Sequence, residues 1–350
     1  MKYVYIQEFG EPLLGGEKPE PALSGTEVLI RVKAAGVCHS DLHLWEGGYD
    51  LGQGRKLSLK DRGVTPPITM GHETAGELMA VGPDAEGVAI GESYLVYPWI
   101  GCGVCPTCRN GFENYCGNAA YIGVHRDGGY AECLRVPHPR YLLPIGDLDP
   151  ADVAPLACSG VTTYSAVKKF GAQIKDQPVV VIGGGGLGQM CIQVLRALDG
   201  AGAVVVDLDP AKREAAVAAG ALAAVDGGAP DAAARIAAAV GGPAFSVLDL
   251  VGSPQSAALA FDCLAKGGTL VMVGLFGGTA PWSLPLIPIK AARILGSLVG
   301  NLGELRELLD LARAGRIKPI PVTRLPLDRA NDALVGLRRG EFVGRAILCP

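Results

Sequence analysis

Four cysteines at close spacing have the pattern of a metal site. Cys102, Cys105, Cys108 and Cys116 fall within 15 residues, and the glycines and the proline between them allow the chain to curl. Four thiolates complete the tetrahedral shell of a structural zinc ion. An iron–sulfur cluster, which four thiolates also hold, and two disulfides are the alternatives. Only one basic residue, Arg109, lies inside this run, which argues against a nucleic-acid-binding zinc ribbon.

Cys38 begins a second group of residues that can bind a metal or move protons. His39, Ser40, Asp41 and His43 follow it within six residues, and we expect this stretch to be a crowded loop. A catalytic zinc ion keeps three protein ligands and an open position for water or substrate, and two cysteines with one histidine form one such set. Two further ligands therefore have to come from elsewhere in the chain.

The best candidates for these two ligands are Cys158 and His72. Cys158 lies in a Gly/Ser-rich turn, and His72 lies between Gly71 and Glu73. Three of the other cysteines lie in apolar strand or helix patterns typical of core positions, and a fourth is next to last in the chain: Cys133, Cys191, Cys263 and Cys349.

A glycine-rich turn after an apolar strand has the pattern of a phosphate-binding site. Val179–Ile182 runs into Gly183, Gly185 and Gly188, so G-x-G-x-x-G stands between a predicted strand and a predicted helix. Free N–H groups and the helix dipole there would meet a pyrophosphate. Asp207, 19 residues later, would accept the ribose hydroxyls and repel a 2′-phosphate, which predicts NAD rather than NADP. Alternatively, the glycines only make a tight turn and Asp207 is a solvated acid.

The metal-site candidates precede the glycine turn in a part of the chain with its own pattern. Up to about residue 158, short strands broken by glycine and proline predict a β-rich, barrel-like module. These strands are Glu27–Val32, Gly76–Val81, Gly91–Val96 and Ala131–Val136. Between Gly47 and Pro67 the chain is polar and without period, so we expect a long exposed loop.

After Thr162, apolar runs alternate with alanine-rich helical segments, which predicts a doubly wound parallel sheet. The predicted strands are Val179–Ile182, Ala203–Val206, Ala221–Val225, Ser246–Leu250, Thr269–Val273 and Ile294–Val299. The predicted helices are Leu187–Leu198, Ala211–Ala219, Asp231–Val240 and Pro254–Leu264. A helix near Glu304–Ala314 and a strand at Arg345–Cys349 are expected to return to the first part of the chain.

Length and composition favour a two-domain protein with small-molecule partners. A chain of 350 residues is long enough for two cores. A net charge of −4 gives no electrostatic reason to bind nucleic acid or an anionic membrane. No window approaches the roughly 20 apolar residues of a membrane helix, and the N-terminus lacks a secretory pattern, so we expect a cytoplasmic protein. Ten cysteines then indicate metal ligands or chance rather than disulfides.

Together these motifs resemble the zinc-dependent alcohol dehydrogenases of the medium-chain dehydrogenase/reductase family, and most of all its shorter, tetrameric bacterial and archaeal members. The resemblance runs almost from end to end and rests on Gly36–His43, Gly71–Glu73, the four-cysteine run, Pro155–Tyr164, the glycine turn with Asp207, and Gly344–Arg345. It implies an α/β fold with a GroES-like catalytic domain over 1–159, whose zinc lobe spans about 101–117. A Rossmann NAD-binding domain over 160–300 and a return to the catalytic domain over 301–350 would follow.

The resemblance implies two zinc ions per subunit, one catalytic and one structural, with NAD as the cofactor. Cys38, His72 and Cys158 would hold the catalytic zinc, and the four-cysteine run would hold the structural zinc. Glu73 would lie behind these ligands or exchange with one of them. Asp41 would accept a hydrogen bond from His72 and fix its orientation.

The resemblance also implies a proton path and a set of cofactor contacts. Ser40 would take the substrate proton and pass it through the cofactor ribose to His43, although a turn hydroxyl and a solvated imidazole are the alternatives. The contacts implied at the cofactor pyrophosphate are His39, Arg345 and the turn of Gly183, Gly185, Gly186, Leu187 and Gly188. Thr162 and the backbone of Val273, Gly274 and Leu275 would lie at the nicotinamide. Asp207 and Lys212 would lie at the adenosine ribose. Lys212 is otherwise a solvated helix lysine.

The reaction that the resemblance implies is reversible, NAD-linked oxidation of primary or secondary alcohols, apolar or aromatic, to aldehydes or ketones. Hydride would leave a zinc-bound alkoxide, and the enzyme would be a homotetramer. Trp99 and Trp45 are candidates for the substrate pocket wall, or else core residues. One alternative is a polyol or sugar dehydrogenase of the same superfamily, which usually has Glu where Cys158 stands. Another is a nucleotide-binding relative that has lost catalysis.

Overall fold

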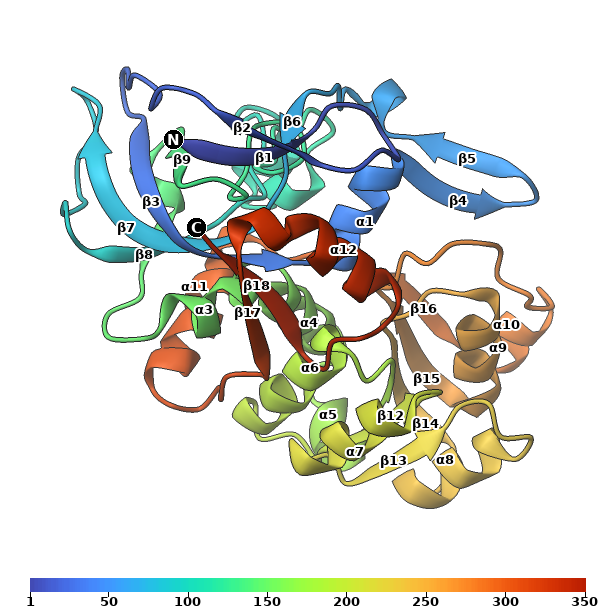
Figure 1. The fold of residues 1–350 in the computed structure, drawn as a ribbon. Helices are drawn as coiled ribbons and strands as arrows, with labels where there is room; N and C mark the ends of the chain where they lie inside the picture. The colour runs from blue at the N-terminus through green and yellow to red at the C-terminus, as the bar shows by residue number, and fades with distance from the viewer.

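Two β-sheets organise the chain, and a computed structural model describes all of its residues, 1–350. A mixed sheet of seven strands lies in the upper part of Figure 1, and a parallel sheet of six strands lies in the lower part. One apolar cluster of 75 buried residues contains members of both sheets, so the sheets share a core. The α/β fold with a β-rich part and a doubly wound part is therefore confirmed.

The mixed sheet brings together segments from both ends of the chain. Its strands are β3 (Val28–Val37), β7 (Glu73–Val81), β8 (Ser93–Val96), β9 (Cys133–Val136), β10 (Leu142–Pro144), β17 (Val322–Pro326) and β18 (Arg345–Cys349). The order is β10-β8-β7-β3-β18-β17, and β9 also pairs with β3. Gly36 of β3 is opposite Glu73 of β7 on one side and Ile347 of β18 on the other. The end of β3 and the starts of β7 and β18 therefore meet.

Smaller elements surround this sheet. A three-stranded sheet has the order β2-β1-β6, with β1 (Lys2–Ile6), β2 (Leu14–Glu17) and β6 (Ile68–Thr69). Short helical turns are α2 (Pro106–Arg109), η2 (Glu113–Tyr115), η3 (Pro139–Tyr141), α3 (Pro150–Val153), η4 (Ala154–Ala157) and η5 (Leu327–Arg329). Strands β17 and β18 pair beside β3, so the last part of the chain lies with the first. The exact domain limits at 159/160 and 300/301 stay a prediction.

The parallel sheet has the strand order of a dinucleotide-binding fold. Its strands are β11 (Val179–Ile182), β12 (Ala203–Asp207), β13 (Ala223–Asp226), β14 (Ala244–Asp249), β15 (Leu264–Met272) and β16 (Arg293–Gly296). The order is β13-β12-β11-β14-β15-β16, and all neighbours are parallel. Six strands form where the sequence predicts them, with small differences at their ends. Because the order reverses between β11 and β14, the crevice at their carboxyl ends is the expected nucleotide site.

Helices cover both faces of the parallel sheet. Those that contact its strands are α5 (Gln173–Asp176), α6 (Gly186–Ala197), α7 (Pro210–Ala218), α8 (Ala232–Val240) and α9 (Pro254–Cys263). Of the other helices, α4 (Ser159–Lys168) packs on α6, α11 (Leu302–Arg313) packs on α4, α12 (Ala330–Arg338) packs on β3, β17 and β18 of the mixed sheet, and α10 (Leu286–Ile289) precedes β16. Val180 and Val204 pack with buried residues of α8 and α9. Val181 and Val205 belong instead to the large cluster with α6. This alternation follows from the two-residue period of a strand. None of the helices combines the length and the apolar character needed to cross a membrane.

The expectation of a long loop between Gly47 and Pro67 is wrong. This segment forms a hairpin of β4 (Gly48–Gly52) and β5 (Arg55–Ser58), followed by the 3₁₀ turn η1 (Lys60–Arg62). The two turn residues, Gln53 and Gly54, have φ of 56° and 75°, the left-handed geometry that suits a two-residue hairpin. The sequence gives a weak signal, because Gln-Gly is not a usual turn pair and the strands contain glycine and charged residues.

The stretch after Cys38 is also not a loop, because it forms the helix α1 (His39–Glu46). Cys38 is the N-cap, and its main-chain N–H donates to Asp41 Oδ2 at 2.8 Å. Gly47 ends the helix in the left-handed conformation, with φ of 74°. The Asp41 carboxylate, in the first turn, thus satisfies a main-chain N–H at the start of the helix. Helix N-termini favour a negative charge at this position. The metal-ligand candidate therefore has a fixed place at a helix start.

Candidate active site

Three segments that are far apart in the sequence bring Cys38, His72 and Cys158 together. Cys38 follows β3, His72 precedes β7, and Cys158 lies between η4 and α4. Their ligand atoms all lie within 4.8 Å of one another, and the two sulfur atoms are 3.9 Å apart. All three side chains are buried. The Cys158 thiol donates a hydrogen bond that lowers the pKa of Cys38 well below its ordinary value, which favours a thiolate at Cys38.

The His72 ring is oriented by a buried carboxylate. Its Nδ1 atom lies 3.2 Å from Asp41 Oδ1, and the other Asp41 oxygen accepts bonds from Cys38 N–H and from the Tyr130 hydroxyl, at 2.8 and 3.1 Å. The remaining ring nitrogen, Nε2, is buried and has no hydrogen-bond partner in the protein. A carboxylate behind one ring nitrogen and a free second nitrogen are the arrangement of a metal-binding histidine. The Cys₂His donor set therefore fits zinc.

A buried ion pair lies behind this triad. Arg345 Nη2 is 3.1 Å from Glu73 Oε1, and the side chains are 2% and 0% exposed. The Ser159 N–H donates to the same oxygen at 3.3 Å. Burial raises the pKa of Glu73, and the Arg345 guanidinium opposes this effect by stabilising the carboxylate. A Cβ atom at Gly36 would lie 2.0 Å from Glu73 Oε2, so the ion pair depends on a glycine at this position of β3.

The glycine turn has the close backbone approaches that its motif predicts. Gly183 has φ of 107°, and a Cβ at Gly188 would lie 2.1 Å from the Gly183 carbonyl oxygen. The Gly184 N–H donates to Asp207 Oδ2 at 2.7 Å, which joins the end of β12 to the turn. The first turn of α6 therefore begins next to the carboxyl ends of β11 and β12. Its free main-chain N–H groups lie at this edge of the parallel sheet.

Three basic side chains gather near the start of α6. A Cβ at Gly186 would lie 3.3 Å from the Arg345 guanidinium carbon, so Arg345 reaches from the Glu73 pair to the glycine turn. Desolvation lowers the pKa of His39, and the charges of Arg345 and Lys212 lower it further although Cys38 opposes them. The His39, Arg345 and Lys212 side chains thus act on one another where a pyrophosphate is expected.

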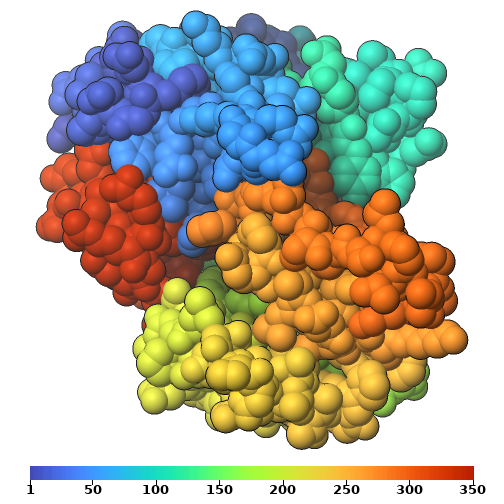
Figure 2. Space-filling view, turned by 90° about the vertical axis from the view of Figure 1, so that its right-hand side faces the viewer, coloured from blue at the N-terminus to red at the C-terminus, as the bar shows by residue number.

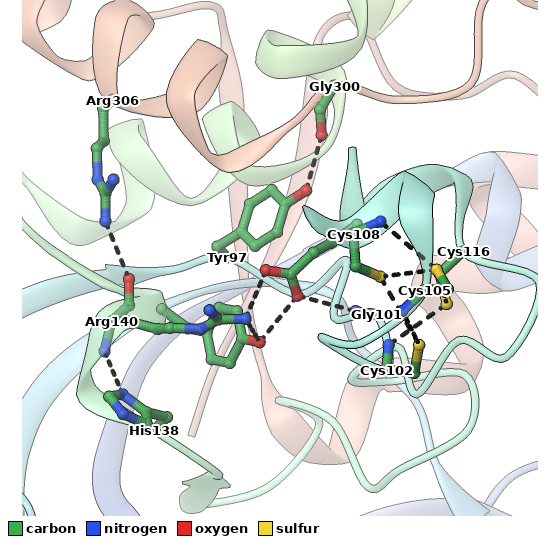
Figure 3. Close-up of polar contacts among 12 residues, drawn as sticks. Tyr97, Gly101, Cys102, Cys105, Cys108, Cys116, His138, Arg140, Gly300 and Arg306 are labelled. Atoms are coloured by element: carbon green, nitrogen blue, oxygen red, sulfur yellow. Dashed lines mark hydrogen bonds and ion pairs between the residues drawn. The ribbon is translucent and has the colours of Figure 1, made fainter. Parts of the chain in front are cut away.

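The four cysteines of the lobe form a second compact donor set. Three sulfur pairs, Cys102–Cys108, Cys105–Cys108 and Cys105–Cys116, are 3.9, 3.4 and 3.9 Å apart (Figure 3). These distances are far longer than a disulfide bond, and all ten cysteines of the chain are free. Main-chain N–H groups of Val104 and Cys105 lower the pKa of Cys102 to about 6. Four converging sulfurs leave no open position, which fits a structural metal.

A polar network ties this lobe to the mixed sheet. Glu113 accepts hydrogen bonds from the Gly101 N–H at 3.0 Å and from the Tyr141 hydroxyl at 2.9 Å, and it pairs with Arg140. Figure 3 shows this network between the cysteines and the segment that precedes β10. Sequence reasoning missed Glu113, because nothing near it in the sequence distinguishes it from a solvated acid.

The comparisons with known proteins agree with this geometry. Residues 24–147 match the model of the alcohol dehydrogenase GroES-like domain, and residues 186–314 match that of the zinc-binding dehydrogenases. An NAD-dependent alcohol dehydrogenase of Sulfurisphaera tokodaii is 39% identical over the full length of both chains. The chain belongs to the zinc-dependent alcohol dehydrogenases of the medium-chain dehydrogenase/reductase family.

Two further relatives help to place the chain within this family. The crystal structure of an alcohol dehydrogenase from Aeropyrum pernix superposes with a TM-score of 0.91 at 32% identity and covers 100% of both chains. A D-arabinose 1-dehydrogenase (NADP⁺) of Saccharolobus solfataricus is 32% identical over 100% of this chain and 97% of that protein. Both relatives share the full length of this alcohol dehydrogenase.

The two tryptophans expected at the substrate pocket lie in different surroundings. The Trp99 ring is 5.3 Å from the His72 ring, and its indole N–H donates to the Ala157 carbonyl at 2.9 Å. Trp99 therefore lies beside two ligand candidates of this alcohol dehydrogenase. The Trp45 indole N–H donates to the Glu11 carbonyl, and the Arg338 guanidinium lies over its ring.

The proton-path and nicotinamide candidates occupy the same part of the enzyme. Ser40 and His43 lie on α1, one turn apart, directly after Cys38. Thr162 is buried on α4, and its N–H donates to the Cys158 carbonyl at 2.9 Å. Val273, Gly274 and Leu275 follow β15, at the carboxyl edge of the parallel sheet. A Cβ at Gly274 would lie 2.0 Å from the Val251 carbonyl carbon, so the backbone is closely packed there.

Two tyrosines of the site were not predicted. Tyr130 donates to Asp41 from a segment 89 residues away, and no local pattern could have indicated this contact. Tyr49 is a half-buried residue of the unexpected hairpin, and its ring lies 4.8 Å from that of His43. The alternation of Tyr49 and Leu51 around Asp50 is the only sequence signal for this strand.

The Arg345–Glu73 pair can be tested by unfolding measurements. Arg345→Met leaves the buried Glu73 carboxylate without its cation, so we expect the free energy of unfolding to fall by roughly 3 kcal/mol. Adding Glu73→Gln should restore more than half of this loss. The control is Arg339→Met, which removes an exposed pair with Glu341 and should cost less than about 1 kcal/mol. An equal loss of unfolding free energy in Arg345→Met and Arg339→Met would contradict the assignment of Arg345 and Glu73 as a buried ion pair.

Proposed function

We propose that this alcohol dehydrogenase oxidises primary or secondary alcohols reversibly to aldehydes or ketones, with NAD as the hydride acceptor. The observation that carries the proposal is the buried Cys38–His72–Cys158 triad with an unpartnered His72 Nε2, close to a glycine turn at the edge of a parallel sheet. Cys38, His72 and Cys158 would hold one zinc ion, and the four-cysteine lobe would hold a second. Zinc supplies a Lewis acid that lowers the pKa of the substrate hydroxyl, and NAD accepts the hydride.

The side chains around the triad have distinct parts in this reaction. Asp41 holds His72 in the orientation that presents Nε2. Ser40 accepts the hydroxyl proton and passes it toward His43, which is half-buried one turn further along α1 and lines a surface pocket. Burial lowers the pKa of His43, although Glu46 opposes it, so the imidazole is neutral near pH 7 and able to accept a proton. Trp99 covers His72 and excludes water from this side of the site.

The cofactor would lie along the carboxyl edge of the parallel sheet. The glycine turn and the start of α6 would take the pyrophosphate, with Arg345 and His39 beside it. Asp207 and Lys212 would meet the adenosine ribose, while Thr162 and the backbone of Val273–Leu275 would position the nicotinamide. Arg345 contacts both the Glu73 carboxylate and the glycine turn, so it would join the metal site to the cofactor site.

We further propose that the substrates are apolar or aromatic alcohols and that the enzyme acts in the cytoplasm. The indole N–H of Trp99 is satisfied by Ala157, so the Trp99 ring offers an apolar face beside the triad. A sugar dehydrogenase is the second candidate, because a D-arabinose dehydrogenase is among the relatives. Cys158, where polyol enzymes usually have Glu, favours the first candidate.

The assignment of Cys38 as a zinc ligand predicts that Cys38→Ser loses one zinc ion and most of its activity. Zinc content should fall from two to one ion per chain, and kcat for alcohol oxidation should fall by at least about a thousand-fold because the Lewis acid is lost. Metal analysis and an NADH absorbance assay measure these changes. Cys349→Ser, which changes a half-buried cysteine outside both donor sets, is the control and should keep both ions and full activity. Full activity in a Cys38→Ala protein without metal at this site would end the proposal.

The Asp207 assignment predicts a change in cofactor preference. In Asp207→Ser the carboxylate no longer repels a 2′-phosphate, so the ratio of kcat/KM for NADP to that for NAD should rise roughly ten-fold or more. Asp209→Ser, which removes the neighbouring N-cap of α7 instead, is the matched control. A native enzyme that prefers NADP would show that Asp207 does not contact the ribose.

Assembly into a homotetramer is supported by an exposed sheet edge. Strand β16 ends the parallel sheet, and large apolar side chains beside it are exposed, among them Leu284, Ile289, Leu295 and Leu298. An open strand edge with an apolar surface favours pairing with another chain. Light scattering should therefore give four times the chain mass of 36.1 kDa. Replacing Leu295 by Lys should lower this mass, and a monomeric native protein would exclude the tetramer.

A further inference from the structure

A surface pocket of about 360 Å³ opens beside His43, the last residue of the proposed proton path. Its walls come from the end of α1, from the β4–β5 hairpin and from Phe276 of the segment after β15. Apart from Phe276, every residue that lines it is charged, polar or glycine. A pocket with this size and lining can hold water. The half-buried His43 side chain therefore has a route to solvent here.

The hairpin wall of this pocket is fixed against the parallel-sheet part of the chain. The Gly278 N–H, from the segment after β15, donates to the Asp50 carbonyl at 3.2 Å. A Cβ at Gly277 would lie 2.7 Å from the same oxygen, so the two backbones touch. Figure 2 shows the blue surface of the hairpin region against the orange surface of the parallel-sheet part. The pocket is therefore a fixed part of the fold rather than the space beside a free loop.

Glu46 is an acid that faces the same pocket as His43. The two residues are three positions apart on α1, and side chains at this spacing are neighbours on a helix surface. Both line the pocket. The Glu46 side chain is exposed, and its carboxylate forms neither a hydrogen bond nor an ion pair within the protein. Its negative charge is therefore available to act on the His43 ring.

Lys56 brings the opposite charge to this pocket from the hairpin. Its Nζ atom donates to the main-chain carbonyl of Glu46 at 3.1 Å, at the end of α1. A Cβ at Gly48 would lie 2.9 Å from Lys56 Cε, so the lysine stem lies along the start of β4. Lys56 thus bonds to the main chain of Glu46 and not to its carboxylate. The pocket holds one anion and one cation that do not neutralise each other by direct contact.

Other charged or titratable groups lie on the elements around His43. They come from α1 and its N-cap, from the hairpin and from α12, which also packs on α1: Cys38, His39, Tyr49, Asp50, Arg55 and Arg338. Burial lowers the pKa of His43, and the charges of Glu46 and then Cys38 oppose this effect. Glu46 is thus the charge with the larger influence on the proton affinity of the His43 ring.

We propose that Glu46 and Lys56 are positioning residues that act through His43: the Glu46 carboxylate holds the transferred proton on the imidazole, and the Lys56 ammonium favours its release into the pocket. This inference rests on the proposed alcohol dehydrogenase function and adds the last step of its proton path. In this step an N–H bond of the protonated His43 ring breaks, and a water molecule or a buffer base in the pocket takes the proton. His43 returns to the neutral imidazole that can accept the next proton.

The test is the pH dependence of the first turnover of NAD reduction, followed by stopped-flow absorbance at low ionic strength. In the native enzyme this rate should fall with pH as His43 becomes protonated and can no longer accept a proton. Glu46→Gln removes a charge that favours protonation, so this acid limb should move to lower pH by roughly half a unit. Lys56→Gln removes a charge that opposes protonation, so the limb should move to higher pH.

The control is Asp61→Asn, which removes an exposed acid of η1 outside the pocket and should leave the limb in place. High salt should reduce the shifts in both variants, because exposed charges are screened. Shifts in opposite directions distinguish an electrostatic role from a structural one, since local damage would not follow the sign of the charge removed.

An acid limb that stays in place in Glu46→Gln, shifts of the same sign in both variants, or a native profile without an acid limb would overturn the inference. In each of these cases the enzyme still oxidises alcohols, so the alcohol dehydrogenase function stands. If no alcohol of a broad series reduces NAD at any pH, the proposed function itself fails, and the inference with it.

Discussion

The pairing of β3 with β7 and β18 is the constraint on which the active site depends. Cys38 follows β3, His72 immediately precedes β7, and Arg345 begins β18, so the register of three strands decides whether these side chains meet. Because side chains alternate along a strand, a slip of one residue would turn Glu73 and Arg345 to the opposite face. Gly36 is the point of closest approach, since any Cβ there would overlap the Glu73 carboxylate.

This register places buried charges together, and each of them has a partner. Burying an isolated ion costs several kcal/mol, and the partner recovers this cost only if the geometry is good. Glu73 has Arg345 and the Ser159 N–H, and Asp41 has His72, Cys38 N–H and the Tyr130 hydroxyl. His72 Nε2 is buried without a hydrogen-bond partner, as is Glu73 Oε2 beside it. The His72 ring offers a ligand atom within 4.8 Å of both cysteine sulfurs, so a metal ion held by the three side chains would satisfy Nε2.

Local patterns predicted much of the fold, and long-range contacts explain what they missed. The six parallel strands, the glycine turn and the four-cysteine lobe are each encoded within a short stretch, so periodicity and spacing indicate them. The contacts Tyr130–Asp41 and Ser159–Glu73 join residues more than 80 positions apart, and only the folded sheet brings them together. The hairpin was missed for a different reason, because Gln53 adopts a left-handed backbone conformation that its residue type does not predict.

The Trp99 and Tyr121 rings link the four-cysteine lobe with the Cys38–His72–Cys158 group. The Tyr121 hydroxyl donates to Asn114, which lies just before Cys116 of the lobe, and the Trp99 indole donates to Ala157, which precedes Cys158. The two rings contact each other edge to face. The Tyr121 ring is therefore held by the lobe, and the Trp99 ring is held by the segment that carries Cys158. The four-cysteine lobe, which leaves no open coordination position, therefore sets where the Tyr121 ring lies, and this ring packs on the Trp99 ring beside His72.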